Sequence, residues 1–254
     1  MREFVQPRMA KHRAGSAIGY ADPAYWDALY QGKSEDALFE WYLDAAQLAP
    51  MLWPLLPATR ATDVVEVGCG TRPLLPGLKE LRPSSFGRLV ATDLSDAAVA
   101  RAGETAGPGI ECRVADARAT GLEAESWDIV LDKATCDAMM SSAEHGPANV
   151  AALSGEAARL LRPGGCLVVV THTQPDLHLE GEEPEPESDA RPLIRALIEG
   201  ACASAPTAHW SVEAHVPDPE DCPRVLVLRK RARRVSRGRR PAASEARDVR
   251  CRLV

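Results

Sequence analysis

The chain has 254 residues, 45% of them apolar and 26% charged, with a formal net charge of −6, which is ordinary for a globular protein that buries one substantial core. The longest uninterrupted aliphatic run, Leu167–Val170, is far shorter than the ~20 apolar residues that span a bilayer. The seven cysteines are scattered and form no C-x-x-C pair, which argues against a disulfide scaffold or a zinc site.

The N-terminal part is rich in aromatic residues. Residues 1–20 are basic, contain glycine and show no periodicity, so we expect a flexible arm. Half of the chain's twelve aromatic residues follow within a short stretch; they are Tyr25, Trp26, Tyr30, Phe39, Trp41 and Tyr42. Apolar residues then recur at helical spacing, which predicts a helix over 35–49, capped by Ser34 and ending before Pro50.

The middle of the chain alternates short β-branched runs with helical segments. The predicted strands are 63–67, 88–92, 110–115, 127–131 and 166–171, and the predicted helices are 95–106, 149–161 and 191–203. This alternation predicts an α/β fold with a parallel sheet and helices on both faces. Residues 209–216 and 224–228 are separated by too few residues for a crossover, so they predict an antiparallel hairpin. The sheet would then have seven strands, mostly parallel, with the hairpin at its C-terminal end.

Charge is unevenly distributed along the chain. Residues 229–254 carry +9 and the remaining residues carry −15, while residues 180–189 hold six acids and two prolines. Both stretches are too polar to bury. We therefore expect a flexible arm over 1–20, one domain over 21–229 with an acidic loop at 180–189, and a basic, disordered tail over 230–254. The tail could solubilise the chain, act as a nuclear-import-like cluster or dock an acidic partner such as RNA; the first is favoured.

The predicted strands end in glycines and acids. Gly68 and Gly70 follow the first strand, and Asp93 follows the second strand, 23 residues after Gly70. Glycines allow backbone N–H groups to approach a ligand, and an acid about 20 residues later is placed to accept hydrogen bonds from ribose hydroxyls. Ligands of open α/β sheets bind at this edge, so the pattern predicts a pocket for an adenosine-type nucleoside.

Missing features narrow the choice of nucleoside. Pro73 stands where a dinucleotide fingerprint needs its third glycine, and a Walker A lysine motif is absent. Glu66, Asp93 and Asp116 are acids at successive strand ends, which suits a cationic ligand without phosphates, such as S-adenosylmethionine. Alternatively, Asp93 could cap the following helix, and Glu66 could be an ordinary carboxylate with satisfied hydrogen bonds.

Several motifs together resemble the class I S-adenosylmethionine-dependent methyltransferases. They are Val64-Val-Glu-Val-Gly-Cys-Gly70, Ala91-Thr-Asp-Leu-Ser95, Val114-Ala-Asp-Ala117, Trp127-Asp-Ile-Val-Leu-Asp-Lys133 and Leu161-Arg-Pro-Gly-Gly165. Two further stretches are similar to the elongation factor 1-alpha lysine methyltransferases and their citrate synthase relatives. Tyr25-Trp-Asp-Ala-Leu-Tyr30 with Glu40-Trp41 resembles a YWDxRY…W signature, and Leu131-Asp-Lys-Ala-Thr-Cys-Asp-Ala138 resembles an LDKGTLDA loop. The resemblance covers roughly residues 20–175 and implies a Rossmann-like sheet.

The resemblance implies S-adenosylmethionine as cofactor and gives roles to the matching residues. Trp26, Tyr30 and Trp41 would close the pocket, and Gly68, beside Gly70, would approach the methionine part. Asp93 would hold the ribose, Leu94 would flank the adenine face, Asp116 and Ala117 would contact the adenine edge, and Lys133 would line the pocket. The aromatic residues could instead fix an N-terminal helix to the core. Thr71-Arg72, Ala134 and Cys136 depart from the family pattern, which bears on the acceptor side.

The predicted activity is protein-lysine N-methylation. An acceptor lysine must lose a proton before attack, and Asp132 is the candidate to orient the amine, with Asp137 second. Alternatively, Asp132 could cap the next turn and pair with Lys133. The six histidines show no spacing that suggests a metal site or a catalytic base, and no metal is predicted.

Three other functions are considered. These are a small-molecule methyltransferase, a catalytically silent methyltransferase-like binding module and, least favoured because of Pro73, a dehydrogenase. The expected partner is a protein substrate, with no membrane and no requirement for nucleic acid; oligomeric state has no signal in the sequence. No secretory signal is recognised, and the cysteine pattern favours a reducing, cytoplasmic location, with nuclear or organellar sites left open.

Overall fold

The structure is a computed structural model that describes residues 19–31, 41–57, 59–172, 190–215, 223–231 and 250–253. Its described strands form one sheet in the order β3-β2-β1-β4-β5-β7-β6-β8. The strands are β1 (Thr62–Val67), β2 (Phe86–Asp93), β3 (Glu111–Val114), β4 (Trp127–Lys133), β5 (Leu161–Thr171), β6 (His209–His215), β7 (Arg224–Arg231) and β8 (Arg250–Leu253). Strands β1 to β5 are parallel, whereas β7 is antiparallel to both β5 and β6. The predicted α/β class, with a mostly parallel sheet and an antiparallel C-terminal hairpin, is confirmed.

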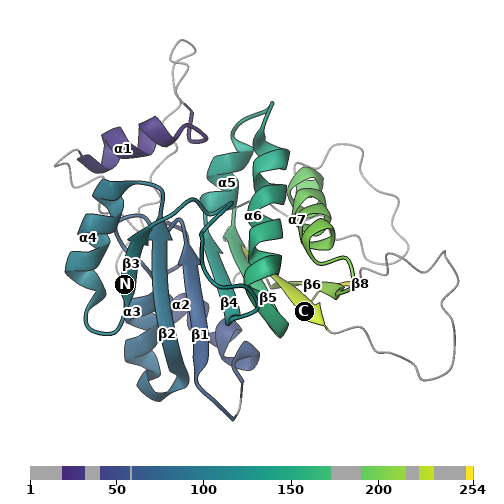
Figure 1. The fold of residues 1–254 in the computed structure, drawn as a ribbon, viewed down its shortest axis with the longest axis horizontal. Helices are drawn as coiled ribbons and strands as arrows, with labels where there is room; N and C mark the ends of the chain where they lie inside the picture. Colours follow the sequence, from purple (N-terminus) through teal and green to yellow (C-terminus); the bar gives the residue numbers. More distant parts are fainter. Residues whose placement is uncertain are drawn as a thin grey trace, which may run out of the picture.

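Helices cover both faces of the sheet (Figure 1). They are α1 (Pro23–Gln31), α2 (Ala45–Leu52), α3 (Leu75–Leu81), α4 (Asp96–Ala106), α5 (Thr135–Met140), α6 (Gly146–Leu160) and α7 (Ala190–Ser204), with short 3₁₀ turns η2 (Trp53–Leu55) and η3 (Pro83–Ser85). Alternate side chains of each strand enter one of two cores, because successive side chains of a strand point to opposite faces. Val65 and Val67 pack with α6 and α7, while Val64 packs with α2 and α3. None of the helices described in these ranges has the length and apolar character needed to cross a membrane.

The predicted helix over 35–49 is wrong in its bounds. Residues 32–40 lie outside the described residues, and α2 begins only at Ala45, where Asp44 and Gln47 form a reciprocal capping box. Tyr42 has a φ of 61°, which takes the chain out of helical geometry just before the cap. Helix α2 also continues through Pro50 to Leu52, so the proline did not end it.

Four other elements, β5, α3, α5 and β8, differ from the prediction. The Arg162-Pro-Gly-Gly165 turn is a bulge inside β5, since pairing with β4 passes from Leu161 to Cys166 across it. Helices α3 and α5 are too short to give a periodic signal. Strand β8, which pairs with β6 in parallel, comes from the tail that we expected to be disordered. Residues 1–18, 173–189, 216–222 and 232–249 lie outside the described residues, and so do the acidic loop and most of the expected arm and tail.

Candidate functional site

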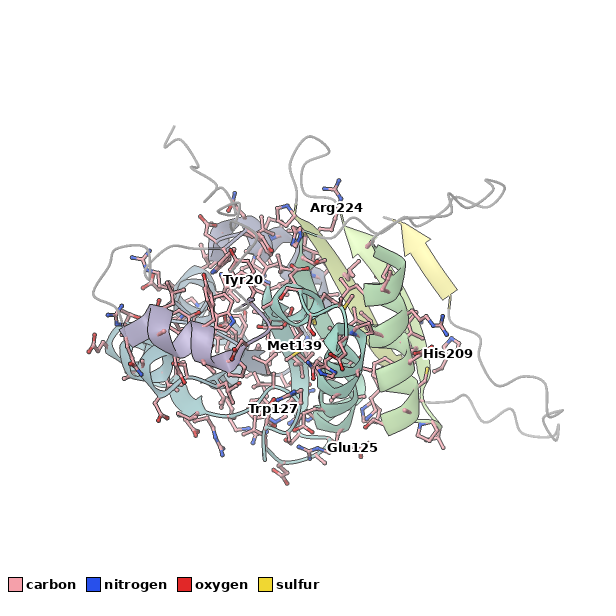
Figure 2. All side chains as sticks on the ribbon, turned by 90° about the horizontal axis from the view of Figure 1, so that it is seen from above. Tyr20, Glu125, Trp127, Met139, His209 and Arg224 are labelled. Carbon is pink, nitrogen blue, oxygen red and sulfur yellow. The ribbon has the colours of Figure 1, made fainter. Side chains whose placement is uncertain are left out.

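A cavity of about 310 Å³ lies at the carboxyl ends of β1, β2 and β4, between these strand ends and helix α1. Figure 1 shows α1 above this edge of the sheet, and Figure 2, which looks down on the edge, places Met139 between α1 and α6. The ten residues to which the family resemblance gives cofactor-binding roles all line this one cavity: Trp26, Tyr30, Trp41, Gly68, Gly70, Asp93, Leu94, Asp116, Ala117 and Lys133. Residues separated by more than a hundred positions are thus brought to one place, as the edge rule for parallel sheets requires.

The glycine turn after β1 is closed by the protein's own side chains. Gly68 and Gly70 both have left-handed backbones, with φ values of 64° and 59°. A Cβ on Gly68 would lie 1.9 Å from Oγ1 of Thr135, and that hydroxyl donates to the carbonyl of Val67 at 3.2 Å. A Cβ on Gly70 would lie 3.1 Å from the hydroxyl oxygen of Tyr30. The glycines therefore serve the packing of α5 and α1 as well as access to a ligand.

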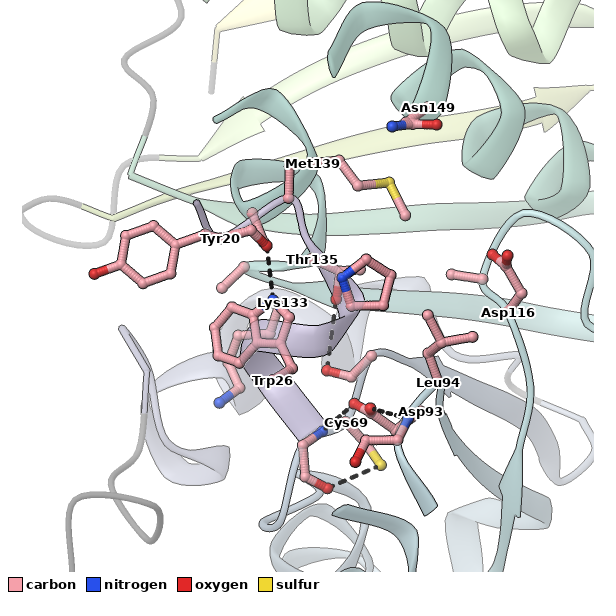
Figure 3. A pocket seen from close by; sticks show the side chains of 18 of the residues that line it. Tyr20, Trp26, Cys69, Asp93, Leu94, Asp116, Lys133, Thr135, Met139 and Asn149 are labelled. Atoms are coloured by element: carbon pink, nitrogen blue, oxygen red, sulfur yellow. Dashed lines mark hydrogen bonds between the residues drawn. The ribbon is translucent and has the colours of Figure 1, made fainter. Parts of the chain in front are cut away.

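Asp93 holds the turn and faces the cavity (Figure 3). Its carboxylate accepts hydrogen bonds from the backbone N–H groups of Gly70, at 2.8 Å, and Ser95, at 3.0 Å. Burial raises the pKa of Asp93, while these backbone bonds oppose the shift. The backbone of Leu94 also bonds to this carboxylate, and since a carboxylate offers about four acceptor positions, at least one remains for a hydroxyl group of a ligand. Asp93 can therefore bond to the backbone at the start of α4 and face a ligand at the same time, so its two predicted roles are compatible.

The other two predicted acids do not carry free negative charge into the cavity. Glu66 is buried and does not line it; its carboxylate accepts the backbone N–H groups of Leu74 and Leu75 at the start of α3. Asp116 does line the cavity, but Arg118 binds its carboxylate and lowers the pKa of Asp116. The prediction that three strand-end acids meet a cationic ligand is therefore wrong for Glu66 and weakened for Asp116.

An aromatic layer covers the cavity. Trp26 and Tyr30 of α1 stack with ring centroids 5.7 Å apart, and Trp41 meets Trp26 edge-on at 6.3 Å. The indole N–H of Trp26 donates to the carbonyl of Tyr20 at 2.7 Å. Tyr30 is buried against Ala98 of α4, which anchors α1 to the domain. The aromatic residues therefore fix the N-terminal helix and line the cavity at once.

Sequence reasoning missed several lining residues. Tyr20 fell in the expected arm, yet its ring lies 5.8 Å from that of Trp26. Asp27 lies between Trp26 and Tyr30 in the aromatic stretch but was not among the expected ligand-binding residues, while Met139 and Asn149 belong to no motif. Only Asp27 could have been found from its position, because it shares a helical turn with Trp26 and Tyr30.

A second cavity of about 390 Å³ adjoins the first. It is lined by Tyr20, Trp26, Trp41, Tyr42, Ala134, Asp137, Ala138, Met140, Ser141, His172, Pro192 and Leu193. Tyr20, Trp26, Trp41, Ala134 and Ala138 line both cavities. Rings and one carboxylate, that of Asp137, therefore surround a space that begins where the first cavity ends.

Asp132 does not occupy the position that we predicted for it. Its side chain is fully buried, lines neither cavity and accepts the backbone N–H of Cys136 at 3.2 Å. Burial, with the charge of Asp137 adding to it, raises the pKa of Asp132 to about 8. The bond from Cys136, in the first turn of α5, agrees with the capping part of the alternative, and Asp137 is the carboxylate that lines the second cavity.

Comparison with known proteins matches residues 65–169 to a family described as "Methyltransferase domain". Citrate synthase-lysine N-methyltransferase of Pongo abelii is 31% identical over 180 residues, which cover 63% of this chain and 73% of that protein. The chain belongs to the class I S-adenosylmethionine-dependent methyltransferases. EEF1A lysine methyltransferase 4 of Bos taurus is 30% identical over 167 residues, covering 62% of this chain and 63% of the relative. The chain thus spans slightly less than two thirds of that relative's length.

This methyltransferase also shares its fold with solved structures. A TehB-like methyltransferase from Corynebacterium glutamicum has a TM-score of 0.50 and 14% identity, with 83% of this chain and 100% of that chain covered. At that identity the likeness concerns the fold alone. Two motifs, one in the N-terminal stretch and one at the end of β4, indicated a resemblance to the lysine methyltransferase group. The relatives confirm this resemblance.

The residues present suit S-adenosylmethionine. The cavity volume is at the lower end of the range for small-molecule sites. Its walls supply a buried carboxylate for hydroxyl groups, apolar side chains of Leu94 and Ala117 for a flat ring, and aromatic faces for a cation. Gly68 and Gly70 have no side chains that would fill the floor of the cavity.

Proposed function

We propose that this methyltransferase transfers a methyl group from S-adenosylmethionine to the side chain of a lysine in a protein. The observation that carries the proposal is the second cavity, which adjoins the first and is lined by Tyr20, Trp26, Trp41, Tyr42 and Asp137. A lysine side chain has a long apolar stem and a cationic end, and aromatic faces favour such cations by about 0.5–2 kcal/mol per contact. The first cavity would hold the cofactor.

In the first cavity, Asp93 would accept a ribose hydroxyl, because its carboxylate keeps at least one acceptor position beyond its bonds from the backbone. Leu94 would lie against the adenine face, with Asp116 and Ala117 at the adenine edge. Gly68 and Gly70 would lie beside the methionine part. Trp26, Tyr30, Trp41 and Lys133 would close the remaining side.

Catalysis would come mainly from placement. The bound cofactor supplies a methyl group on a positively charged sulfur, which is a strong electrophile and needs no covalent enzyme intermediate. The protein's part is to line up the acceptor nitrogen and to exclude water, which can account for a large share of the rate enhancement. Trp26 and Trp41 suit this task because they line both cavities and stand where the two meet.

The relatives support a protein acceptor. Their names give elongation factor 1A and citrate synthase as substrates. Similarity near 30% over less than two thirds of this chain supports the class of acceptor but does not carry over the individual substrate.

The test is to incubate the full chain with heat-treated cell lysate and cofactor labelled with tritium in the methyl group. Labelled proteins are then hydrolysed, and the amino acids are separated. We expect label in methylated lysine, and none with Asp93→Ala. Label confined to the small-molecule fraction would contradict the proposal and favour a small-molecule acceptor. Purified, bacterially produced elongation factor 1A and citrate synthase are the first individual proteins to try.

A further inference from the structure

The geometry points to His172 as the base that takes the proton from the acceptor ammonium group, with Asp137 and Tyr42 as its positioning residues. This inference rests on the proposed function and adds a residue that none of the sequence motifs contains. His172 directly follows β5 and lines the second cavity.

The imidazole is held by two side chains from distant parts of the chain. Oδ2 of Asp137 lies 3.2 Å from Nδ1 of His172, and the hydroxyl oxygen of Tyr42 lies 2.8 Å from the same nitrogen. Asp137 is itself fixed, since it accepts the hydroxyl of Thr171 at 2.5 Å and the backbone N–H of His172 at 3.2 Å. The ring therefore cannot turn without losing its contacts to Asp137 of α5 and to Tyr42, which precedes α2.

The Asp137 carboxylate favours the tautomer of the neutral ring that carries its proton on Nδ1, because an ionised carboxylate only accepts hydrogen bonds. In this tautomer the hydroxyl oxygen of Tyr42 also accepts from Nδ1. The lone pair of the neutral ring is then on Nε2. A proton received there gives an imidazolium whose charge is balanced by the buried carboxylate.

The surroundings make His172 a stronger base than an ordinary histidine. The hydrogen bond that His172 donates to Asp137 raises the pKa of His172, against the opposing effect of burial. Of the described residues that line this cavity, the titratable ones are Tyr20, Tyr42, Asp137 and His172. Asp132, in β4, lies outside this cavity and accepts the backbone N–H of Cys136, and burial together with the charge of Asp137 raises the pKa of Asp132 to about 8.

The backbone of Tyr42 gives a second, independent observation that supports the role of His172. Its φ of 61° is unusual for a bulky residue and costs of order 1–3 kcal/mol. That conformation places its ring 6.0 Å from Trp41 and 5.8 Å from His172, measured between ring centroids. The ring of Tyr42 thus lies between Trp41, which lines the first cavity, and the imidazole of His172.

In the proposed reaction, the lysine ammonium group loses a proton before the methyl group is transferred. The lysine ammonium gives one proton to Nε2 of His172, which leaves a neutral amine and an imidazolium. The lone pair of the amine then forms the bond to the methyl carbon as the carbon–sulfur bond breaks and its electron pair stays on sulfur. The imidazolium later releases its proton to solvent.

The test compares initial rates of lysine methylation between pH 6 and pH 10 at saturating cofactor, with heat-treated lysate protein as acceptor. For His172→Asn we expect a roughly 100-fold lower rate at pH 7.5. The deficit should shrink towards pH 10, because lysine amines with pKa values near 10.4 then lose their proton to water. A purely structural role would give a similar loss at every pH.

Variants of the two neighbours sharpen the test. Asp137→Asn removes the charge that stabilises the imidazolium, so the rising limb of the pH profile should move to lower pH by roughly one unit while the plateau falls. Tyr42→Phe should lower the rate by only a few-fold.

His145→Asn is the matched control. His145 also has a carboxylate nearby, Oε1 of Glu144 at 3.6 Å, but its side chain is 67% exposed and it lines neither cavity. Cofactor titration and thermal melting would verify that each variant folds. Unchanged rate and pH profile in His172→Asn, with methyl-lysine formed by the unmodified chain, would overturn the role of His172 alone. Absence of methyl-lysine from the unmodified chain would overturn the proposed function as well.

Discussion

The two cavities adjoin each other but are built differently. The first is formed by residues next to strand ends, such as Gly68, Asp93 and Asp116, and short motifs mark nearly all of them. The second is formed by Tyr42, His172 and the start of α7, together with Asp137 of α5, and motifs mark few of these residues.

This difference follows from how each cavity is assembled. A parallel sheet brings all its carboxyl ends to one edge, so local sequence suffices to place a cofactor site there. The second cavity needs a loop before α2, the end of β5 and the first turn of α7 to meet. We infer that the cofactor side depends on individual strand-end residues, whereas the acceptor side depends on packing between distant segments.

The largest effect is expected for Asp93→Ala. The change removes a buried carboxylate and leaves the N–H groups of Gly70 and Ser95 without their acceptor. Hydrogen bonds to charged groups contribute about 1.5–3 kcal/mol each, so cofactor affinity should fall at least roughly 100-fold, as measured by calorimetry. Asp96→Ala, on the exposed start of α4, is the control. Equal affinity in both variants would mean that the cofactor does not bind beside Asp93.

Trp41→Ala tests whether the two cavities can be separated. Trp41 lines both, so its loss should weaken cofactor binding and slow methylation together, each by roughly 10-fold, or about 1.4 kcal/mol. Calorimetry and the labelling rate at saturating cofactor report the two effects separately. Trp53 lines neither cavity, so Trp53→Ala should change neither the cofactor affinity nor the methylation rate. A change in only one quantity would assign Trp41 to a single side.

Asp132→Asn is expected to change stability more than activity. The pKa of Asp132 is about 8 in the folded chain and near 3.9 in the unfolded chain. Between these values the folded state binds one more proton than the unfolded state, so stability falls as pH rises, by up to ~1.4 kcal/mol per pH unit. The amide removes this dependence. Urea unfolding at pH 5 and pH 8 should therefore show a smaller difference in the variant.

The same variant bears on catalysis. Because Asp132 lines neither cavity, the methylation rate of Asp132→Asn should stay within a few-fold of the rate of the unmodified chain. A loss near that of His172→Asn, without loss of folding, would restore Asp132 as a group acting on the amine.

The smallest effect is expected for Ala134→Gly. Ala134 has a φ of 71°, where a residue with a Cβ is strained by roughly 1–2 kcal/mol, and the related loop motif carries glycine here. Glycine relieves the strain but loses more entropy on folding, so the net gain should be about 0.5–1 kcal/mol. Ala138→Gly, inside α5, should destabilise by a similar amount. Thermal melting of the pair measures both, and a loss of stability in Ala134→Gly would contradict the strain.

Strand-level features were predictable because they depend on local patterns. The cap at Ser95 agrees with the prediction, and β2 and β4 end at Asp93 and Lys133, one and two residues beyond their predicted ends, since β-branched runs and capping residues act over a few positions. The helix start at Ala45 was not predictable from apolar spacing, because the left-handed backbone at Tyr42 interrupts a pattern that looks continuous in sequence.

Side-chain partners decided the rest. Glu66 and Asp132 follow the expected pattern of strand-end acids, yet backbone N–H groups of α3 and α5 take up their carboxylates. Asp116 meets Arg118 in the same way. A carboxylate at a strand end can face a ligand, a helix start or an arginine, and only its neighbours in space select among these.

The sequence by itself determined the α/β sheet, its antiparallel end and the strand-end and aromatic residues of the first cavity. Periodicity and strand-end motifs depend on neighbouring residues in the chain, and a parallel sheet places all residues at its carboxyl strand ends along one edge. Tertiary structure alone decided that Asp137, Tyr42 and His172 form one cluster beside that cavity. They come from three segments whose meeting depends on packing across the sheet, and no spacing along the chain encodes it.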